Sequence, residues 1–217
     1  MKNVLPWTLV AVVTVAAVAS FSEFQRFKTK YGAAHQHADV RTDMIRWAAA
    51  GLDAPIVVLG DSITEMARFP DTIAGHPVVN AGIGGANIAA TAARARALLD
   101  GVKPALIVVA VGMNDRGSGR VRSDYTNLLA LLRPLAPLLC IGVTPADGAN
   151  AVNAEIEKAA GAIGLRVVDV GLPAGETVDG VHPTHAGLAV IVPAAVRAIE
   201  NALKSPESTR ATPAQGE

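Results

Sequence analysis

Apolar residues along the chain fall into short strand-like runs and longer stretches with helical spacing. Five runs rich in aliphatic residues are typical of buried strands, namely Ile56–Leu59, Val78–Asn80, Ala105–Val111, Leu138–Val143 and Arg166–Val170. Apolar residues three or four positions apart predict helices over Ala86–Leu99, Arg122–Leu132, Asn150–Ile163 and Leu188–Leu203. The alternation of the two patterns predicts an α/β fold, a three-layer α/β/α sandwich around a five-stranded parallel sheet.

An apolar segment that has no polar face lies near the start of the chain, after Lys2. Val4–Phe21 contains no charged residue, and its length of about 18 residues lies between that of a signal-peptide core and that of a spanning helix. The small residues Ala17 and Ala19 would permit cleavage. We therefore expect residues 1–21 to be a signal peptide or a membrane anchor, and a helix buried in the domain is the alternative.

Two features of the sequence bear on which side of the membrane the domain lies, and they point in opposite directions. Arg26, Lys28 and Lys30 come directly after it and oppose export of the downstream chain by the positive-inside rule. The apolar segment itself favours an extracytoplasmic domain, either periplasmic or secreted, that contacts the membrane only if the segment is not cleaved. The rest of the chain divides into a connector and first helix over 22–53, an α/β domain over 54–204 and a disordered tail over 205–217.

Composition narrows the function classes. Hydrophobic residues make up 51% of the chain and charged residues 18%, which is enough apolar material for a packed core. The formal net charge of +0 predicts no broad basic surface, so nucleic acid is not an expected partner. Cys140 is the only cysteine and lies in an apolar run, so we expect an inert buried thiol and no internal disulfide.

Polar clusters follow the predicted strands. The clusters are Asp61-Ser62 after the first strand, Gly82–Asn87 after the second, Gly112–Asp115 after the third and Asp179–Thr184 before the last helix. Because the carboxyl ends of parallel strands meet at one edge of a sheet, all four clusters are expected in one pocket.

Each cluster alone has a structural explanation. Ser62 with Glu65 fits a capping box at the start of a helix. The glycines after the second strand suit a tight turn, and Asn114 and Asp179 are common turn residues. We expect Asp61 to hold its own loop through hydrogen bonds to the backbone.

Together the clusters contain the groups that acyl transfer requires. A serine hydroxyl becomes a nucleophile when a base removes its proton, and His182 is the candidate base for Ser62. Asp179, three residues before His182, can fold back and orient the imidazole. The oxyanion of the tetrahedral intermediate requires fixed donors, which the backbone N–H groups of Ser62 and Gly84 and the side chain of Asn114 can provide.

In chain order, Gly60-Asp61-Ser62, Gly84 in a glycine turn, Gly112-x-Asn114-Asp115 and Asp179-x-x-His182 resemble the SGNH hydrolases, also called the GDSL esterase/lipase family. The resemblance covers roughly Ala54 to Leu203. It implies a flavodoxin-like sandwich and a serine esterase that uses no metal or organic cofactor. It also implies the roles assigned above, with Ser62, His182 and Asp179 as triad and Ser62, Gly84 and Asn114 as oxyanion hole.

The resemblance leaves the substrate open. Relatives cleave acetyl groups from sugars, acyl chains from lysophospholipids, or small esters and thioesters, so a small-molecule, carbohydrate or lipid acyl ester is the expected partner. Ile63 replaces the leucine of the family name, which is a volume-conserving change. The short segments between the motifs leave little room for a large lid.

Three different functions would also fit parts of the pattern. An inactive SGNH domain could bind a carbohydrate or acyl ester without cleaving it. Asp179, His182 and His185 could hold a metal ion. Gly82-x-Gly84 could begin a dinucleotide fingerprint, although Asn87 stands where its third glycine is expected.

Overall fold

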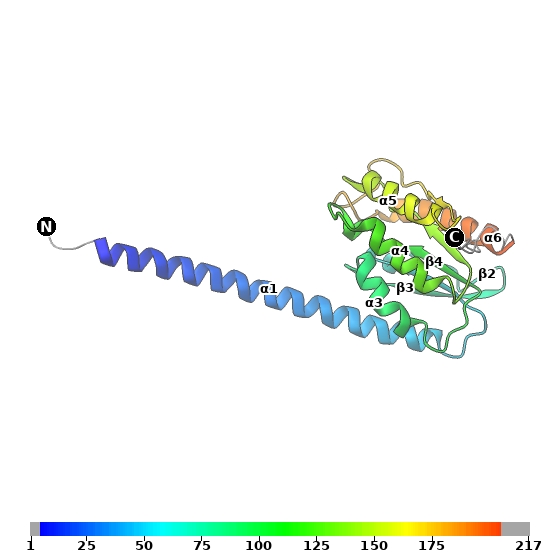
Figure 1. Ribbon diagram of the computed structural model, residues 1–217, viewed down its shortest axis with the longest axis horizontal. Helices are drawn as coiled ribbons and strands as arrows, with labels where there is room; N and C mark the ends of the chain where they lie inside the picture. The colour runs from blue at the N-terminus through cyan, green and yellow to red at the C-terminus, as the bar shows by residue number, and fades with distance from the viewer. Residues whose placement is uncertain (1–4, 205–217) are drawn as a thin grey trace, which may run out of the picture. The chain divides into compact units, whose positions relative to one another are not determined.

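The computed structural model describes residues 5–204, so the tail expected over 205–217 lies outside the described residues. The chain divides into two compact units, Met1–Val40 and Arg41–Glu217 (Figure 1). The second unit contains all the polar clusters of the predicted site and begins within a helix, before the domain start expected at residue 54.

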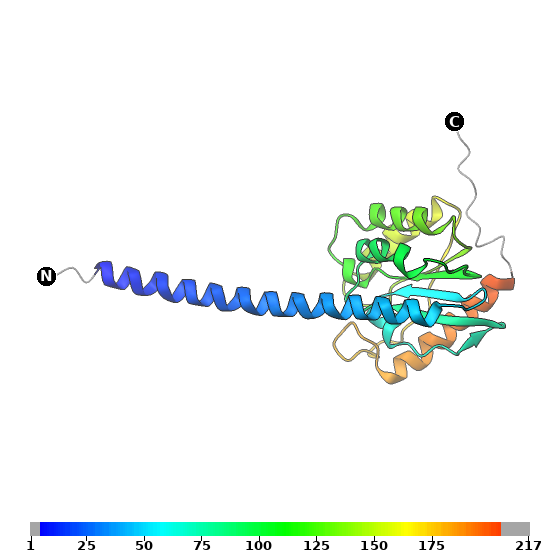
Figure 2. The same cartoon turned by 90° about the horizontal axis from the view of Figure 1, so that it is seen from below.

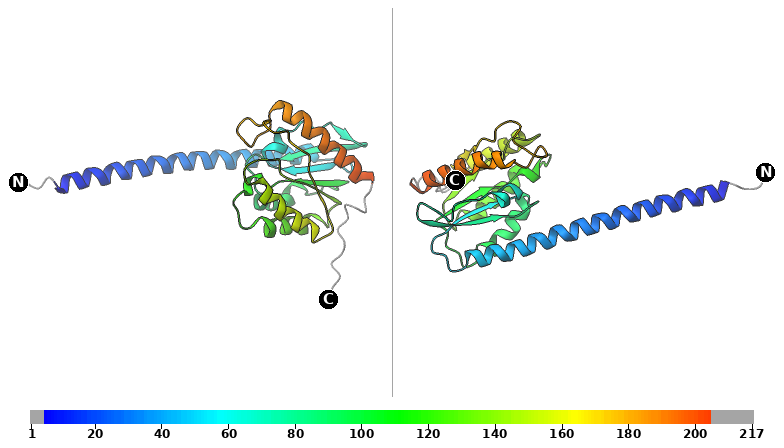
Figure 3. Two further views of the ribbon diagram at one scale, coloured as in Figure 1. Left: turned by 90° about the horizontal axis from the view of Figure 1, so that it is seen from above. Right: turned by 180° about the vertical axis from the view of Figure 1, so that it is seen from behind.

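Helix α1, Leu5–Ala49, is one continuous helix (Figure 3). The connector expected from Ser22 is therefore helical. Strong helix formers such as Glu23, Gln25 and Arg26 follow the apolar segment, and Arg26 pairs with Glu23 at 3.0 Å one turn away. Because residues 22–49 contain no proline and only one glycine, Gly32, nothing ends the helix before Ala49.

Part of α1 has the length and composition of a membrane-spanning segment. Leu9–Thr29 meets this criterion, and none of it is buried within the described structure. It extends beyond the predicted end at Phe21. The last helix, α6 (His185–Lys204), also meets the criterion, but Ile191, Ala195 and Ile199 pack into the core.

The second unit is built on a six-stranded sheet with the order β2-β3-β1-β4-β5-β6. Its strands are β1 (Ile56–Gly60), β2 (Thr72–Ile73), β3 (His76–Gly82), β4 (Leu106–Ala110), β5 (Leu138–Ile141) and β6 (Val167–Val168). All neighbours pair in parallel except β2, which pairs antiparallel with β3. The predicted five parallel strands are confirmed, and the two-residue β2 is an addition that is too short to produce a sequence period.

Helices cover both faces of this sheet (Figure 2). On one face lie α3 (Ile88–Leu98), α4 (Val121–Leu132) and α5 (Ala149–Gly161), and α6 lies on the other. The central strand β1 is buried at all five positions, as expected for a parallel sheet covered on both sides. The predicted α/β/α sandwich is therefore confirmed.

The core beneath α6 joins the sheet to the last helix. Ile56 and Val58 of β1 and Val108 of β4 pack with Ala195 and Ile199 of α6. On the neighbouring strand β5, Cys140 is buried, and burial raises the pKa of its thiol to about 11. The thiol is therefore protonated and inert at neutral pH, as its apolar run indicated.

Candidate active site

The nucleophile candidate begins a short helix directly after β1. Helix α2 runs over Ser62–Met66, and its N-cap is Asp61, whose carboxylate accepts a hydrogen bond from the Ile63 N–H at 3.0 Å. The alternative explanation of Ser62 and Glu65 as a capping box is therefore not supported. Because Asp61 caps the helix, the Ser62 hydroxyl is available for another partner.

That partner comes from the other end of the chain. Ser62 Oγ lies 2.9 Å from His182 Nε2, although the two residues are 120 positions apart. His182 Nδ1 lies 2.7 Å from Asp179 Oδ2. A carboxylate accepts only, so Nδ1 carries the proton of a neutral imidazole and Nε2 is the acceptor that faces the serine hydroxyl.

The loop before α6 holds Asp179 in place. Its Oδ1 accepts from the backbone N–H groups of Val181 at 3.0 Å and His182 at 2.7 Å. The bond from the His182 N–H, followed by that from the His182 side chain, lowers the pKa of Asp179 to about 2. The carboxylate is therefore ionised throughout the neutral range and can stabilise a protonated His182.

A second carboxyl group, Asp61, lies under the nucleophile and is only 2% exposed. Burial raises the pKa of Asp61 to about 6, while the backbone N–H groups of Ile63 and Met113 and the charge of His182 oppose the rise. Its bonds run to the loop backbone, which agrees with the structural role expected for it.

The raised pKa of Asp61 predicts a pH effect on stability. The pKa rises from 3.8 to about 6 on folding, because the buried carboxyl group is favoured in its neutral, protonated form. Protonated Asp61 therefore contributes its full stabilisation of the folded protein below about pH 4, and this contribution is lost as the pH rises through 6. Asp61→Asn removes this ionisation and keeps an oxygen for the Ile63 N–H. We expect the variant to gain about 2 kcal/mol in free energy of unfolding over wild type between about pH 4.5 and 7.5, measured by denaturant unfolding.

A matched control is Asp169→Asn. Asp169 is exposed, and its carboxylate accepts from the N–H two residues ahead, that of Gly171, at 2.8 Å, the same arrangement as in Asp61. This variant measures the effect of an aspartate-to-asparagine change at an exposed turn. Parallel pH dependences of wild type and Asp61→Asn would contradict the assignment of a raised pKa to Asp61.

The oxyanion-donor candidates lie in the turns that follow β4 and β3. Asn114 lies on the short 3₁₀ helix Met113–Asp115, and its Nδ2 donates one hydrogen to Ala86 O at 2.9 Å, which leaves the second hydrogen of the amide. Gly112 begins this turn with φ 143°, a conformation that favours glycine. Asp115 accepts from the Ile88 N–H at 3.0 Å and so joins the turn to the start of α3.

The glycine turn after β3 differs from expectation. The Gly84 N–H, predicted as an oxyanion donor, donates to Glu65 Oε2 at 2.5 Å. It is therefore not free to bind an oxyanion while this bond is in place. The next amide, Gly85 N–H, has no hydrogen-bond partner within residues 5–204, and Gly85 has the positive φ of 74°.

Neither a metal site nor a dinucleotide site is supported by this geometry. In the described part of the chain, no group of three or more His, Cys, Asp and Glu side chains is arranged to hold a metal ion. Asp179 and His182 bond to each other, and His185 is the exposed first residue of α6. In the turn that resembles the start of a dinucleotide fingerprint, the Gly84 N–H bonds to a carboxylate of the chain itself.

Comparison with known proteins decides the family. The family model described as the GDSL-like Lipase/Acylhydrolase family matches residues 58–190, more than half of the chain. The chain belongs to this family. The resemblance seen in the sequence is confirmed, and the protein is a GDSL-type serine hydrolase that acts on acyl ester bonds. No curated protein sequence matches the chain significantly.

Solved structures agree on the GDSL fold. A putative platelet activating factor from Streptococcus pneumonia is 19% identical, with a TM-score of 0.65, over 82% of this chain and 98% of that one. A putative acylhydrolase from Bacteroides fragilis is 21% identical, with a TM-score of 0.58, over 73% and 95%. A catalytic mutant of an acetylxylan esterase from Geobacillus stearothermophilus is 18% identical, with a TM-score of 0.57, over 70% and 96%.

Two residues near the site of this GDSL hydrolase were not found by sequence reasoning. The sequence indicated Glu65 only as part of a capping box, and it placed Arg41 in a connector. Arg41 donates from Nε to Gly82 O at 3.0 Å and from Nη2 to Asn80 O at 3.1 Å. No local pattern links Arg41 to a strand about 40 residues ahead of it.

Proposed function

We propose that the protein hydrolyses small acyl esters with Ser62 as nucleophile, His182 as general base and Asp179 as the group that orients His182. The observation that carries the proposal is the 2.9 Å contact between Ser62 Oγ and His182 Nε2. As Oγ attacks the ester carbonyl, Nε2 takes its proton and then gives it to the departing alcohol. Water, activated by the same nitrogen, releases the acyl group from Ser62.

The oxyanion of the tetrahedral intermediate needs donors beside Ser62. The backbone N–H of Ser62 is at the first position of α2 and therefore has no acceptor within the helix. The second hydrogen of Asn114 Nδ2 is another donor. For the glycine turn, the sequence predicted Gly84, but the bond of Gly84 to Glu65 favours the adjacent Gly85 N–H as the third donor.

The substrate proposal follows from exposure of the triad. The side chains of His182 and Asp179 are 36% and 51% exposed, so the site is open to a bulky alcohol. We therefore propose acetyl esters of carbohydrates, or short-chain and lysophospholipid esters, as substrates. The substrate proposal is tested with a panel of acetylated sugars, lysophospholipids and acyl thioesters. Each is assayed with the purified protein and, as a blank, with Ser62→Ala. Equal release from both proteins for every substrate would contradict it.

We also propose that Leu9–Thr29 directs the GDSL domain out of the cytoplasm, as a signal segment or as a retained anchor. Its length, its apolar composition and the absence of burial along it support this. N-terminal sequencing of the protein from the membrane and soluble fractions distinguishes the two fates. Recovery of the uncleaved chain from the cytoplasm alone would contradict both.

A further inference from the structure

Helix α2 and the glycine turn after β3 are joined by a carboxylate. Glu65 lies one helical turn after Ser62, and its Oε2 accepts the Gly84 N–H at 2.5 Å. A charged acceptor makes this bond shorter and stronger than one between neutral groups. The carboxylate therefore joins the helix that begins with the nucleophile to the turn that carries the proposed donor Gly85.

An arginine from α1 completes this link. Arg41 Nε lies 3.7 Å from Glu65 Oε1, and the same guanidinium donates to the carbonyl oxygens of Gly82 and Asn80. The side chains of Arg41 and Glu65 are only 20% and 24% exposed. Solvent therefore screens the pair less than it screens a surface ion pair.

Close backbone packing makes the link rigid. A Cβ on Gly82 would lie 2.3 Å from the Glu65 N, so the backbone of α2 rests directly on the end of β3. Asn80 of the same strand donates to Thr64 O at 2.7 Å and to Ala67 O at 2.9 Å. Asn80 thus holds the backbone of α2, and the Gly84 turn holds the Glu65 side chain of the same helix.

We propose that Glu65 and Arg41 are positioning residues for the oxyanion hole, an inference that rests on the proposed function. By holding the Gly84 N–H, Glu65 sets the place of the next amide, Gly85 N–H, relative to Ser62. Arg41 keeps the Glu65 carboxylate in that position and binds two carbonyl groups of β3. Arg41 lies outside the residues that the family model matches, so the end of α1 adds a part to the site of this chain.

The proposal predicts a particular kinetic effect. Charge on the carbonyl oxygen develops only in the transition state, so a displaced donor lowers kcat and leaves substrate binding almost unchanged. Removing one oxyanion donor entirely costs about 10²- to 10³-fold in kcat. Displacing a donor that is still present should cost less, about 10- to 100-fold.

The experiment uses full-length protein in detergent with p-nitrophenyl acetate. We expect Glu65→Ala to lower kcat about 10- to 100-fold with KM within about twofold. Glu65→Gln should keep most of kcat, because an amide oxygen still accepts the Gly84 N–H. Binding of methylboronic acid, which forms a tetrahedral adduct with an oxyanion, should weaken in proportion to kcat/KM.

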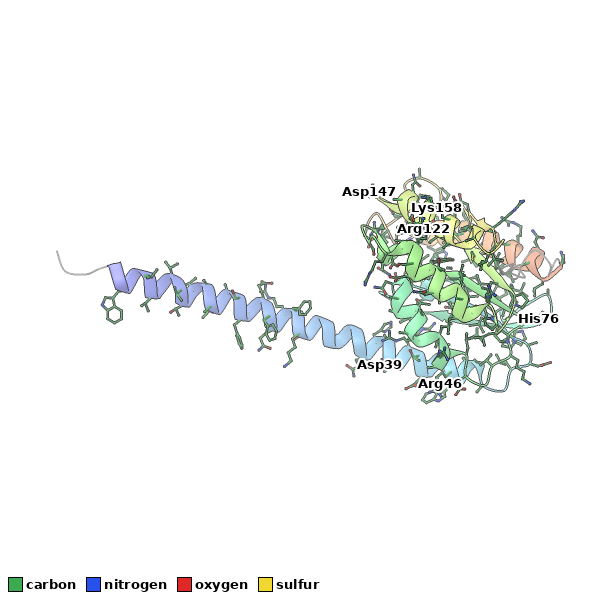
Figure 4. All side chains as sticks on the ribbon, in the orientation of Figure 1. Asp39, Arg46, His76, Arg122, Asp147 and Lys158 are labelled. Atoms are coloured by element: carbon green, nitrogen blue, oxygen red, sulfur yellow. The ribbon has the colours of Figure 1, made fainter. Side chains whose placement is uncertain are left out.

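Arg41→Lys tests the second residue and is a safeguard if Glu65→Ala does not fold. Lysine keeps the charge but cannot donate to two carbonyl groups from a planar fork, so we expect kcat to fall about tenfold with thermal unfolding nearly unchanged. The matched control is Glu155→Ala. Glu155 accepts a hydrogen bond from Arg122 at 2.7 Å on the surface of α4 and α5, where Figure 4 shows Arg122 and Lys158. We expect the kcat of Glu155→Ala to equal that of wild type.

The outcomes separate this inference from the proposed function. Folded Glu65→Ala and Arg41→Lys variants with wild-type kcat, beside an inactive Ser62→Ala, would overturn the positioning role alone. A rise in KM at constant kcat, or an equal loss in Glu65→Gln and Glu65→Ala, would do the same. A wild-type protein that cleaves no ester would overturn both proposals.

Discussion

We expect Ser62→Ala to lower kcat for p-nitrophenyl acetate by about 10⁵- to 10⁶-fold, because no other hydroxyl is in contact with His182 Nε2 among the described residues. We also expect the variant to remain folded. Asp61, and not Ser62, caps α2, so truncating the serine removes no bond that holds the helix. We expect the free energy of unfolding to change by less than about 0.5 kcal/mol. Initial rates and thermal unfolding of the same preparation measure both effects.

The control for this variant is Ser123→Ala. Ser123 is an exposed serine near the start of α4 whose hydroxyl donates to Arg120 O at 2.9 Å, so its loss should leave kcat unchanged. A folded Ser62→Ala protein with wild-type turnover would refute the nucleophile assignment. Loss of activity together with loss of the folded state would instead place Ser62 in the structure of the loop.

His182→Ala is expected to reduce kcat at pH 7 by about 10⁴-fold or more, since Ser62 then loses the base that takes its proton. The rate that remains should increase with pH, because hydroxide from the solvent replaces the missing imidazole. The ionised Asp179 cannot substitute for it, since its pKa is about 2 and it makes a very weak base. A pH–rate profile of wild type and variant measures this difference.

His185→Ala is the matched control for His182→Ala. His185 begins α6, only three residues further along, and is exposed. The triad proposal predicts full activity for this variant, whereas a metal site at Asp179, His182 and His185 would predict a large loss in both. A His182→Ala protein that kept wild-type turnover at neutral pH would remove the base from the mechanism.

The elements of the fold differ in how far the sequence predicted them. Strands β1 and β4 were predicted well, because a central parallel strand buried on both faces is a continuous apolar run. Strand β2 was missed, since its two residues exist as a strand only through pairing with β3. A first helix ending near Ala48 was predicted, but the helical state of the connector that begins at Ser22 was missed, because polar helix formers without an apolar face show no period.

The site shows the same division. The order of motifs predicted that Ser62, Asn114 and His182 would lie at one edge of the sheet, and the structure places Ser62 against His182 there. The capping box was only the structural alternative for Ser62, and the structure does not support it, because Asp61 and Ser62 are both good N-caps and the backbone geometry makes Asp61 the cap. The expected donor Gly84 bonds to Glu65, which a glycine turn alone does not reveal.

Residue type and spacing were sufficient for the layered fold, the family and the identity of the reactive side chains, since these depend on local periodicity and on intrinsic chemistry. Which amide remains free in the glycine turn, which residue caps α2 and why Arg41 of α1 reaches β3 depended on the folded chain. A hydrogen bond requires a donor and an acceptor at the right distance and direction. For groups about 20 to 120 residues apart, only packing sets that geometry.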